Sequence, residues 1–386
     1  MKLEGLRVVD LSLFLPGPAV TMMMADHGAE VIKVENPKGG EPGRYIGYEQ
    51  GGETVFFRAT QRGKKSLTLN LKSDEGKEAL YRLADTADVF IESFRPGVTA
   101  RLGFGYDELR NRNPGIVYCS LAAFGQTGPM RDRPAHDLAT VALAGITSIT
   151  RSAGGDPAII GIAASDLLSS HLAFGGIVMA LYRRHTTGEG DFIDIAMHDS
   201  ILHASPNIMG PVFAENRPPR LNEERSLGGG AMMNVYPTKD EQFVVLAGSE
   251  PKFVQNLFNA LGRPEFIEPV SGLPGEKHWP AIEYLRGVFQ EKTRAEWVDW
   301  FADKDVCFAP VLDLNEAWEH PQVYARDMRL KDGDGNDHVG APIKYANEPA
   351  RPNLALPGLG EHSEEILATL GFSVGEIAAM KESGAI

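Results

Sequence analysis

One carboxylate in the sequence, Asp166, stands at the start of an apolar helix predicted from about Asp166 to His185, and a β-branched strand is expected after it at 192–197. The first turn of a helix has backbone N–H groups without intrahelical partners, and these can hold a buried anion in its ionised form. Such a carboxylate can act as a nucleophile that forms a covalent intermediate and leaves again. The plainer interpretation is a helix cap, because aspartate is among the residues favoured there.

Two other side chains could move protons. Histidine titrates near neutral pH, so His136 could take a proton from a substrate and return it, although an isolated histidine is more often structural. Glu250 is predicted in the first turn of a helix that Ser249 caps, where the helix dipole alone favours glutamate. Each residue therefore has both a chemical and a structural interpretation.

Basic residues cluster in two places, around a strand predicted at 66–71 and in or just after the turn at 94–97. The first group is Arg62, Lys64, Lys65 and Lys72, and the second is Arg95 and Arg101. Arginine binds a phosphate through a planar fork, and lysine binds it as a point charge. For 62–65 we favour a solvated basic edge strand, whereas the turn at 94–97 favours a binding role.

The surrounding sequence predicts alternating strands and helices. Strand patterns occur at 6–11, 30–35, 66–71, 87–92, 116–121 and 192–197, and helical patterns at 74–85, 106–110, 166–185 and 200–213. This alternation favours a parallel sheet and a Rossmann-like α/β fold. The fingerprint Gly-x-Gly-x-x-Gly is absent after the first strand, so we expect neither NAD nor FAD as cofactor.

Length and composition predict a two-domain protein without a membrane span. The 386 residues exceed the roughly 250–300 residues at which single cores stop growing. A smaller α+β domain is expected after the polar segment 216–226, with a helix at 249–262 and a capping box at Thr293. No apolar run approaches the roughly 20 residues of a membrane span. The N-terminus resembles neither a signal nor a transit peptide, so we expect a cytoplasmic protein.

Charge and cysteine content argue against other classes of protein. A net charge of −14 disfavours nucleic acid as the main partner, although a small basic pocket can still hold phosphates. The two cysteines, Cys119 and Cys307, form no paired motif, and the histidines show no ligand spacing. We therefore expect no metal site.

Motifs along nearly the whole chain resemble those of the class III CoA-transferase superfamily, which holds carnitine and formate CoA-transferases together with α-methylacyl-CoA racemases. The matching segments are Leu3-x-Gly-Leu-Arg-Val-Val-Asp-Leu11, Gly17-Pro18, Gly28-Ala-Glu-Val-Ile-Lys-Val-Glu35, Arg62-x-Lys-Lys-Ser-Leu67, Phe94-Arg-Pro-Gly-Val-x-x-Arg-Leu-Gly103, Gly125-Gln-Thr-Gly-Pro129, the Asp166 helix, Thr187-Gly-Glu-Gly-x-Phe-Ile-Asp-Ile-Ala196 and Leu359-Gly-Glu-His-Ser-Glu-Glu-Ile-Leu367. Together these motifs are highly specific.

By this resemblance, Asp166 matches the catalytic aspartate of the family. In the transferases that aspartate attacks an acyl-CoA thioester, the CoA thiolate captures the resulting anhydride as an aspartyl-CoA thioester, and an acceptor acid regains CoA. The implied substrates are coenzyme A, as acyl-CoA, and a small carboxylic acid. The positions that match CoA-binding residues of relatives are Leu69, Lys72, Phe94, Arg95 and Arg101. Asn36 and Ser93 depart from the pattern, because several relatives have arginine and many have asparagine there.

The resemblance leaves the activity open between two branches. Racemases have a His-Asp pair at the position of His136, where transferases commonly have tyrosine, and use the histidine and the aspartate as opposed bases at the proton α to the thioester. Glu250 also matches a racemase glutamate, whereas Ile162 replaces a racemase asparagine. CoA transfer through Asp166 is our leading prediction and racemisation by His136 and Asp166 the alternative. A CoA-binding protein without activity is the third.

The resemblance also implies an assembly. Relatives form intertwined dimers, so we expect an interlocked homodimer. Its large CoA-binding domain would comprise 1–200 completed by 330–386, with a linker at 201–230 and a small domain at 231–329. The turn Gly228–Gly230 fits either a lid that closes over the aspartyl intermediate or an interdomain linker.

Overall fold

A computed structural model describes residues 1–152 and 155–386, which form two compact units. The first unit comprises Met1–Gly145, Ile159–Ala204 and Pro321–Ile386. The second comprises Ile146–Ala158 and Ser205–His320. Each unit has its own hydrophobic core.

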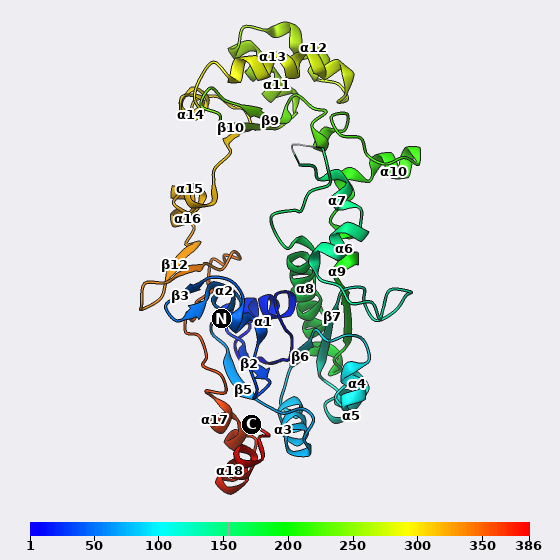
Figure 1. The fold of residues 1–386 in the computed structure, drawn as a ribbon, viewed down its shortest axis with the longest axis vertical. Helices are drawn as coiled ribbons and strands as arrows, with labels where there is room; N and C mark the ends of the chain where they lie inside the picture. The colour runs from blue at the N-terminus through cyan, green and yellow to red at the C-terminus, as the bar shows by residue number, and fades with distance from the viewer. Residues whose placement is uncertain (153–154) are drawn as a thin grey trace. The chain divides into compact units, whose positions relative to one another are not determined.

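A six-stranded parallel sheet forms the centre of the first unit (Figure 1). In spatial order its strands are β5 (Lys65–Thr68), β2 (Glu30–Glu35), β1 (Arg7–Asp10), β6 (Val89–Glu92), β7 (Val117–Ala122) and β8 (Phe192–Ala196). The predicted parallel sheet is thus confirmed. In chain order the strands read 3-2-1-4-5-6, the arrangement of doubly wound nucleotide-binding folds.

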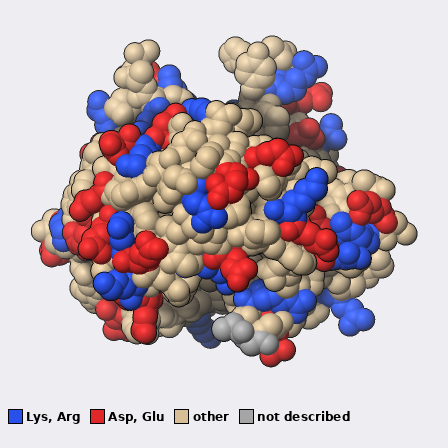
Figure 2. All heavy atoms as spheres, turned by 90° about the horizontal axis from the view of Figure 1, so that it is seen from above, with Lys and Arg blue, Asp and Glu red and all other residues tan. Residues whose placement is uncertain are grey.

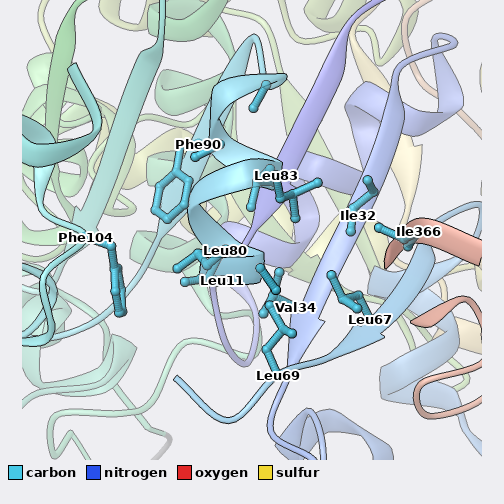
Figure 3. Packing of buried hydrophobic residues seen from close by; sticks show 14 of the residues in the cluster. Leu11, Ile32, Val34, Leu67, Leu69, Leu80, Leu83, Phe90, Phe104 and Ile366 are labelled. Carbon is cyan, nitrogen blue, oxygen red and sulfur yellow. The ribbon is translucent and has the colours of Figure 1, made fainter. Parts of the chain in front are cut away.

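Both faces of this sheet are buried, and successive residues of a strand contribute to opposite cores. Val8 and Val89 belong to one core, whereas Val9 and Phe90 belong to the other. This follows from the two-residue period of a strand, because a parallel sheet with helices on both sides needs apolar residues in both directions. Figure 3 shows Leu80 and the other labelled side chains gathered in the core that contains Val9 and Phe90.

Helices cover the two faces. On one side lie α1 (Pro16–Asp26) and α8 (Ala164–Thr187), and on the other lie α3 (Asp74–Asp85), α17 (Ser363–Thr369) and α18 (Val374–Ser383). The remaining helices of the unit are α2 (Val55–Gln61), α4 (Val98–Leu102), α5 (Tyr106–Arg112), α6 (Asp137–Leu143), α9 (Met197–His203) and α16 (Pro321–Ala325). Two small hairpins pair β3 (Glu49–Gln50) with β4 (Glu53–Thr54) and β12 (Arg329–Lys331) with β13 (Asp337–Val339).

The predicted helix at Asp166 is confirmed as α8, which begins two residues earlier and ends at Gly188 in a left-handed C-cap. Ala173 and Ile177 of α8 pack into the core, one turn apart. The opposite face is exposed and apolar, with Met179 at 68% and Tyr182 at 82% exposure. By length and composition alone α8 is long and apolar enough to cross a membrane, which corrects the expectation that no apolar run approaches that length.

The predicted continuous helix at 200–213 is wrong. The chain forms α9, then a 3₁₀ turn at Pro206–Ile208, then α10 (Gly210–Glu215) in the second unit. Pro206 and Pro211 each stand at the beginning of a new segment. Proline has no N–H to donate and clashes with the preceding turn, so it starts a helix more readily than it continues one.

The second unit contains an antiparallel three-stranded sheet in the order β11 (Phe308–Pro310), β10 (Phe243–Ala247) and β9 (Met233–Pro237). Its helices are α7 (Ile146–Ile149), α10, α11 (Pro251–Ala260), α12 (Ile267–Val270), α13 (Trp279–Phe289), α14 (Arg294–Phe301) and α15 (Leu314–Trp318). The predicted capping box at Thr293 and Glu296 is confirmed. Ser249 does not cap α11, because Glu250 holds the N-cap position, without a side-chain hydrogen bond.

Two of the three basic residues at 62–65, Arg62 and Lys64, are buried. The interpretation of this segment as a solvated edge strand is therefore wrong for these two. Arg62 is 2% exposed and binds both carboxylate oxygens of Asp26, at 3.0 and 2.6 Å. Lys64 is also buried and pairs with Asp10. Lys65 is partly exposed and pairs with Glu30. On the face shown in Figure 2, acidic and basic side chains are interspersed.

Candidate active site

A cavity of about 350 Å³ lies in the first unit, where the carboxyl ends of β1, β6 and β7 meet. Its walls come from the loop after β1, the turn after β6, the end of β7, the loop before α6, and the starts of α8 and α9. The lining residues are Leu13, Phe14, Pro16, Ser93, Phe94, Arg95, Pro96, Leu121, Ala122, Ala123, Arg131, Arg133, Pro134, Ala135, His136, Asp166 and Met197. Neighbouring strands β1 and β6 mark the switch point of the sheet, where α/β proteins characteristically bind ligands.

Asp166 lies in the first turn of α8 and lines this cavity. No described residue donates a hydrogen bond to its carboxylate oxygens, and its backbone N–H donates to Asp137 at 3.2 Å. Burial, followed by the negative charge of Asp137, raises the pKa of Asp166 to about 7. The N–H groups of Ser165 and Asp166, which the sequence predicts as free donors for the Asp166 carboxylate, donate to Asp137 instead.

His136 is the N-cap residue of α6 and lines the same cavity as Asp166. The fold thus brings together the two residues that the sequence pairs at a distance of thirty positions. The His136 ring meets the ring of Phe14 edge-on, with centroids 5.6 Å apart and planes at 87°. Phe14 also lines the cavity and had no role in the sequence analysis.

Phe14 has a left-handed backbone, with φ of 64°, which costs a non-glycine residue about 1–2 kcal/mol. Its N–H donates to Glu41 Oε1 at 2.8 Å, and the Leu13 N–H donates to Ser93 Oγ at 2.8 Å. Glu41 in turn pairs with Lys33 at 3.1 Å. The buried Glu41 and the partly buried Ser93 therefore hold this loop in a conformation that presents Phe14 to His136.

A buried charge cluster underlies that loop. Lys33 lies 3.4 Å and Lys64 lies 3.1 Å from the two carboxylate oxygens of Asp10, and all three side chains are buried. Burial alone would raise the pKa of Asp10, but the two lysines hold it well below its usual value. Burial lowers the pKa of Lys64 to about 8, partly offset by Asp10. Lys64 thus belongs to a buried charge cluster rather than to an exposed basic patch.

Two of the five predicted CoA-binding residues, Phe94 and Arg95, line the cavity. Arg101 lies in α4 and Lys72 follows β5; both are exposed and lie outside the cavity lining. Leu69 is 2% exposed and belongs to the core under the sheet.

Arg131 and Arg133 also line the cavity, and neither is among the residues predicted from the sequence. Among the described residues, no side chain pairs with the guanidinium of Arg95, Arg131 or Arg133. Unpaired guanidinium groups in a cavity are suited to bind phosphates or carboxylates. The segment Arg131-Asp-Arg133, directly after the turn at 125–129, is the signal in the sequence that could have indicated them.

A second carboxyl group with a shifted pKa lies beside the cavity. Glu92 ends β6, is buried, and accepts a hydrogen bond from the N–H of Phe94 at 2.7 Å. Burial raises the pKa of Glu92 to about 7, although its hydrogen bonds with Ser120 and with the Phe94 N–H act to lower it. Glu92 therefore shapes the turn that presents Phe94 and Arg95.

Glu250 and the turn Gly228–Gly230 belong to the second unit, so their roles at the site stay predictions. Gly228 is left-handed, and a Cβ on Gly229 would lie 2.1 Å from the carbonyl oxygen of Glu223. Close backbone packing thus requires glycine at 229. No group of three or more histidine, cysteine, aspartate or glutamate side chains arranged for a metal ion occurs within residues 1–152 and 155–386.

Comparisons with known proteins show which family the chain resembles. The family model described as CoA-transferase family III matches residues 3–363. The chain is 35% identical over 383 residues to the acetyl-CoA:oxalate CoA-transferase of Acetobacter aceti, covering 94% of this chain and 95% of that protein. It is 32% identical over 384 residues to the human α-methylacyl-CoA racemase, covering 98% and 95%.

Solved structures agree with this match. A CAIB/BAIF family protein from Brucella suis superimposes with a TM-score of 0.82 at 29% sequence identity, over 95% of this chain and 99% of that one. The similar proteins thus include CoA-transferases as well as a racemase, which supports an enzymatic role. Because the family model and these relatives span nearly the whole sequence, the chain belongs to CoA-transferase family III.

Proposed function

We propose that the protein is an acyl-CoA:carboxylate CoA-transferase that works through a covalent intermediate on Asp166. The observation that carries this proposal is the Asp166 carboxyl group, which has no hydrogen-bond donor among the described residues and lines a cavity with unpaired arginines. A carboxyl with a pKa of about 7 is largely ionised just above neutral pH and is a stronger base than an ordinary aspartate. This combination suits a nucleophile.

In the proposed reaction, an Asp166 oxygen attacks the thioester carbonyl carbon, and the C–S bond breaks to release CoA thiolate. The thiolate then attacks the aspartyl carbonyl of the anhydride, which releases the donor acid as a carboxylate and leaves an aspartyl-CoA thioester. The acceptor carboxylate repeats the two steps in reverse order, so Asp166 is regenerated and one CoA has moved. Covalent catalysis of this kind divides one difficult exchange into easier steps.

The cavity also suits the substrate chemistry. Phe14, Phe94, Leu121 and Met197 give it apolar walls for an acyl or pantetheine chain. Arg95, Arg131 and Arg133 could bind the phosphates of CoA or the carboxylate of an acid. We include the exposed Lys72 and Arg101 in the proposed CoA site as well, whereas Leu69 would support it from the core.

Racemisation is the second candidate, and a specific observation favours it. His136 and Asp166 line one cavity, and an Asp166 pKa of about 7 suits a group that accepts and returns a proton. The human racemase relative is 32% identical. In this reaction one residue removes the proton α to the thioester and the other returns a proton on the opposite face.

Heavy water distinguishes the two candidates. The purified protein is incubated with a 2-methylacyl-CoA in deuterium oxide without an acceptor acid, and then with acetyl-CoA and a panel of acids in ordinary water. A transferase produces a new acyl-CoA only when an acid is added and takes up no α-deuterium. A racemase takes up α-deuterium without an acid. Neither reaction, with CoA binding alone, would contradict both proposals.

We also propose that the protein is a homodimer. The exposed apolar face of α8, which includes Leu172, Met179 and Tyr182, suits a contact between subunits. Light scattering after size exclusion tests the mass directly. A monomer at micromolar concentration would contradict this proposal.

A further inference from the structure

The first turn of α8 receives its cap from another helix. The N-cap residue of α8 is Ala163, whose side chain has no hydrogen-bonding group. Instead, Asp137 Oδ1 accepts from the Ser165 N–H at 2.7 Å, the Ser165 hydroxyl at 2.7 Å and the Asp166 N–H at 3.2 Å. Alanine is a poor N-cap, so Asp137 supplies from α6 the acceptor that the local sequence lacks.

A second set of hydrogen bonds ties the same two helix starts together. The Thr140 hydroxyl lies 2.6 Å from the Ser165 hydroxyl and 2.7 Å from the Asp137 carbonyl oxygen, so its one proton is within reach of both acceptors. Both hydroxyl residues are fully buried, where an unmade hydrogen bond is costly. His136 and Asp166 are the chain neighbours of the linked residues Asp137 and Ser165. The link therefore fixes how the two cavity residues face each other.

This arrangement also affects charge at the cavity. Backbone donors at a helix start normally stabilise a nearby anion, but here they point to Asp137. Two carboxyl groups thus share one helix end, and only Asp137 receives the donors. The other ionisable side chains that line the cavity with Asp166 are Arg95, Arg131, Arg133 and His136.

We propose that Asp137 is a positioning residue for the reaction, which takes the donors at the start of α8 and holds Asp166 and His136 in a fixed relation. Asp166 is then left as the more basic carboxylate, directed into the cavity without a competing hydrogen bond. This inference rests on the proposed function, because it assumes that Asp166 reacts. It holds for either chemistry, since both require a basic Asp166.

Two substitutions separate the charge of Asp137 from its hydrogen bonds. Asp137→Asn keeps an acceptor oxygen but removes the negative charge, whereas Asp137→Ala removes both. Asp107→Asn is the matched control, because Asp107 is an exposed carboxylate in the first turn of α5 and does not line the cavity. The titration of Asp166 is followed by carboxyl ¹³C NMR, with its signal assigned by its loss in Asp166→Asn.

Asp137→Asn is expected to lower the titration midpoint of Asp166 by about one pH unit or more, because a like charge is removed. The acidic limb of the kcat/KM profile should move by the same amount. Asp137→Ala is expected to lower kcat at least tenfold with little change in KM for acyl-CoA. It should also increase hydrogen exchange in the first turn of α8, which Asp137→Asn should leave protected.

An unchanged Asp166 midpoint in Asp137→Asn would overturn the inference, as would an equal shift in Asp107→Asn. If Asp137→Ala does not fold, the asparagine variant still provides both readouts. Failure of the proposed function is distinguishable, since it would appear as full turnover in Asp166→Asn. The NMR titration tests Asp137 whatever that turnover experiment shows.

Discussion

Replacing Asp10 with asparagine tests how the buried charge cluster holds the loop that carries Phe14. The Asp10 carboxylate lies 3.4 Å from Lys33 and 3.1 Å from Lys64, and it accepts from the Thr21 hydroxyl at 2.6 Å. Asp10 Oδ1, the oxygen nearer Lys33, also accepts from the N–H and the hydroxyl of Ser12. Ser12 precedes Phe14 in the same loop. Asparagine has the same shape but no charge, so two buried ammonium groups would face each other with less compensation.

The structure sets the magnitude. Removing one partner of a buried ion pair costs about 3–5 kcal/mol, because the remaining charge is desolvated without an attraction to offset it. Lys33 keeps Glu41 at 3.1 Å, so we expect the lower end, about 3 kcal/mol. Typical domains have a free energy of unfolding of only about 5–15 kcal/mol, so this loss is large.

Hydrogen exchange in urea, read by mass spectrometry on peptides from β1 and β2, measures the effect in the first unit. All four tryptophans, at 279, 297, 300 and 318, lie in the second unit, so their fluorescence is an internal reference for that unit. Glu30→Gln is the matched control, because its pairs with Arg7 and Lys65 are partly exposed and should contribute about 0–1 kcal/mol. If Asp10→Asn costs no more than this control, the argument from buried charge is refuted.

Three further predictions concern pH, substrate affinity and capping. Because burial raises the pKa of Glu92 from 4.5 to about 7, the folded chain keeps a proton that the unfolded chain releases in this window. The contribution of Glu92 to the free energy of unfolding is therefore fully present below pH 4.5 and is lost, by roughly 3 kcal/mol, as the pH rises from 4.5 to 7. Denaturation of Glu92→Gln across that pH range should not show this loss. Arg133→Ala should raise KM for acyl-CoA roughly tenfold or more with kcat little changed, whereas Arg110→Ala, outside the cavity, should not; equal effects would contradict a binding role. Thr293→Ala removes a confirmed capping box and should cost the second unit about 0.5–2 kcal/mol, read by the tryptophan fluorescence of that unit; no loss would show that the cap contributes nothing.

Much of the architecture could be predicted because it depends on local periodicity. Strand patterns at 30–35 and 116–121 became β2 and β7, and the helical pattern at 74–85 became α3. Much of the site was also predictable. His136, Phe94, Arg95 and Asp166 all follow strands or open helices, and such positions meet at the carboxyl edge of a parallel sheet.

The features that could not be predicted depend on contacts between distant residues. Lys64 reads as a surface lysine until the fold brings it to Asp10, 54 positions earlier in the chain. Asp137 reads as the partner of His136, and only the packing of α6 on α8 shows that it caps the helix of Asp166. The local pattern predicts free N–H donors for Asp166, whereas the fold buries its carboxyl group beside Asp137, and both effects raise its pKa.

The most direct test of the central claim is peptide mass spectrometry of the protein after turnover with acyl-CoA in the presence of hydroxylamine. A covalent aspartyl-CoA thioester at Asp166 should be captured as a hydroxamate on that residue alone. The exposed Asp199, in the first turn of α9, should remain unmodified. Modification confined to Asp166 is the predicted result. Sustained CoA transfer with no hydroxamate at Asp166 would contradict it.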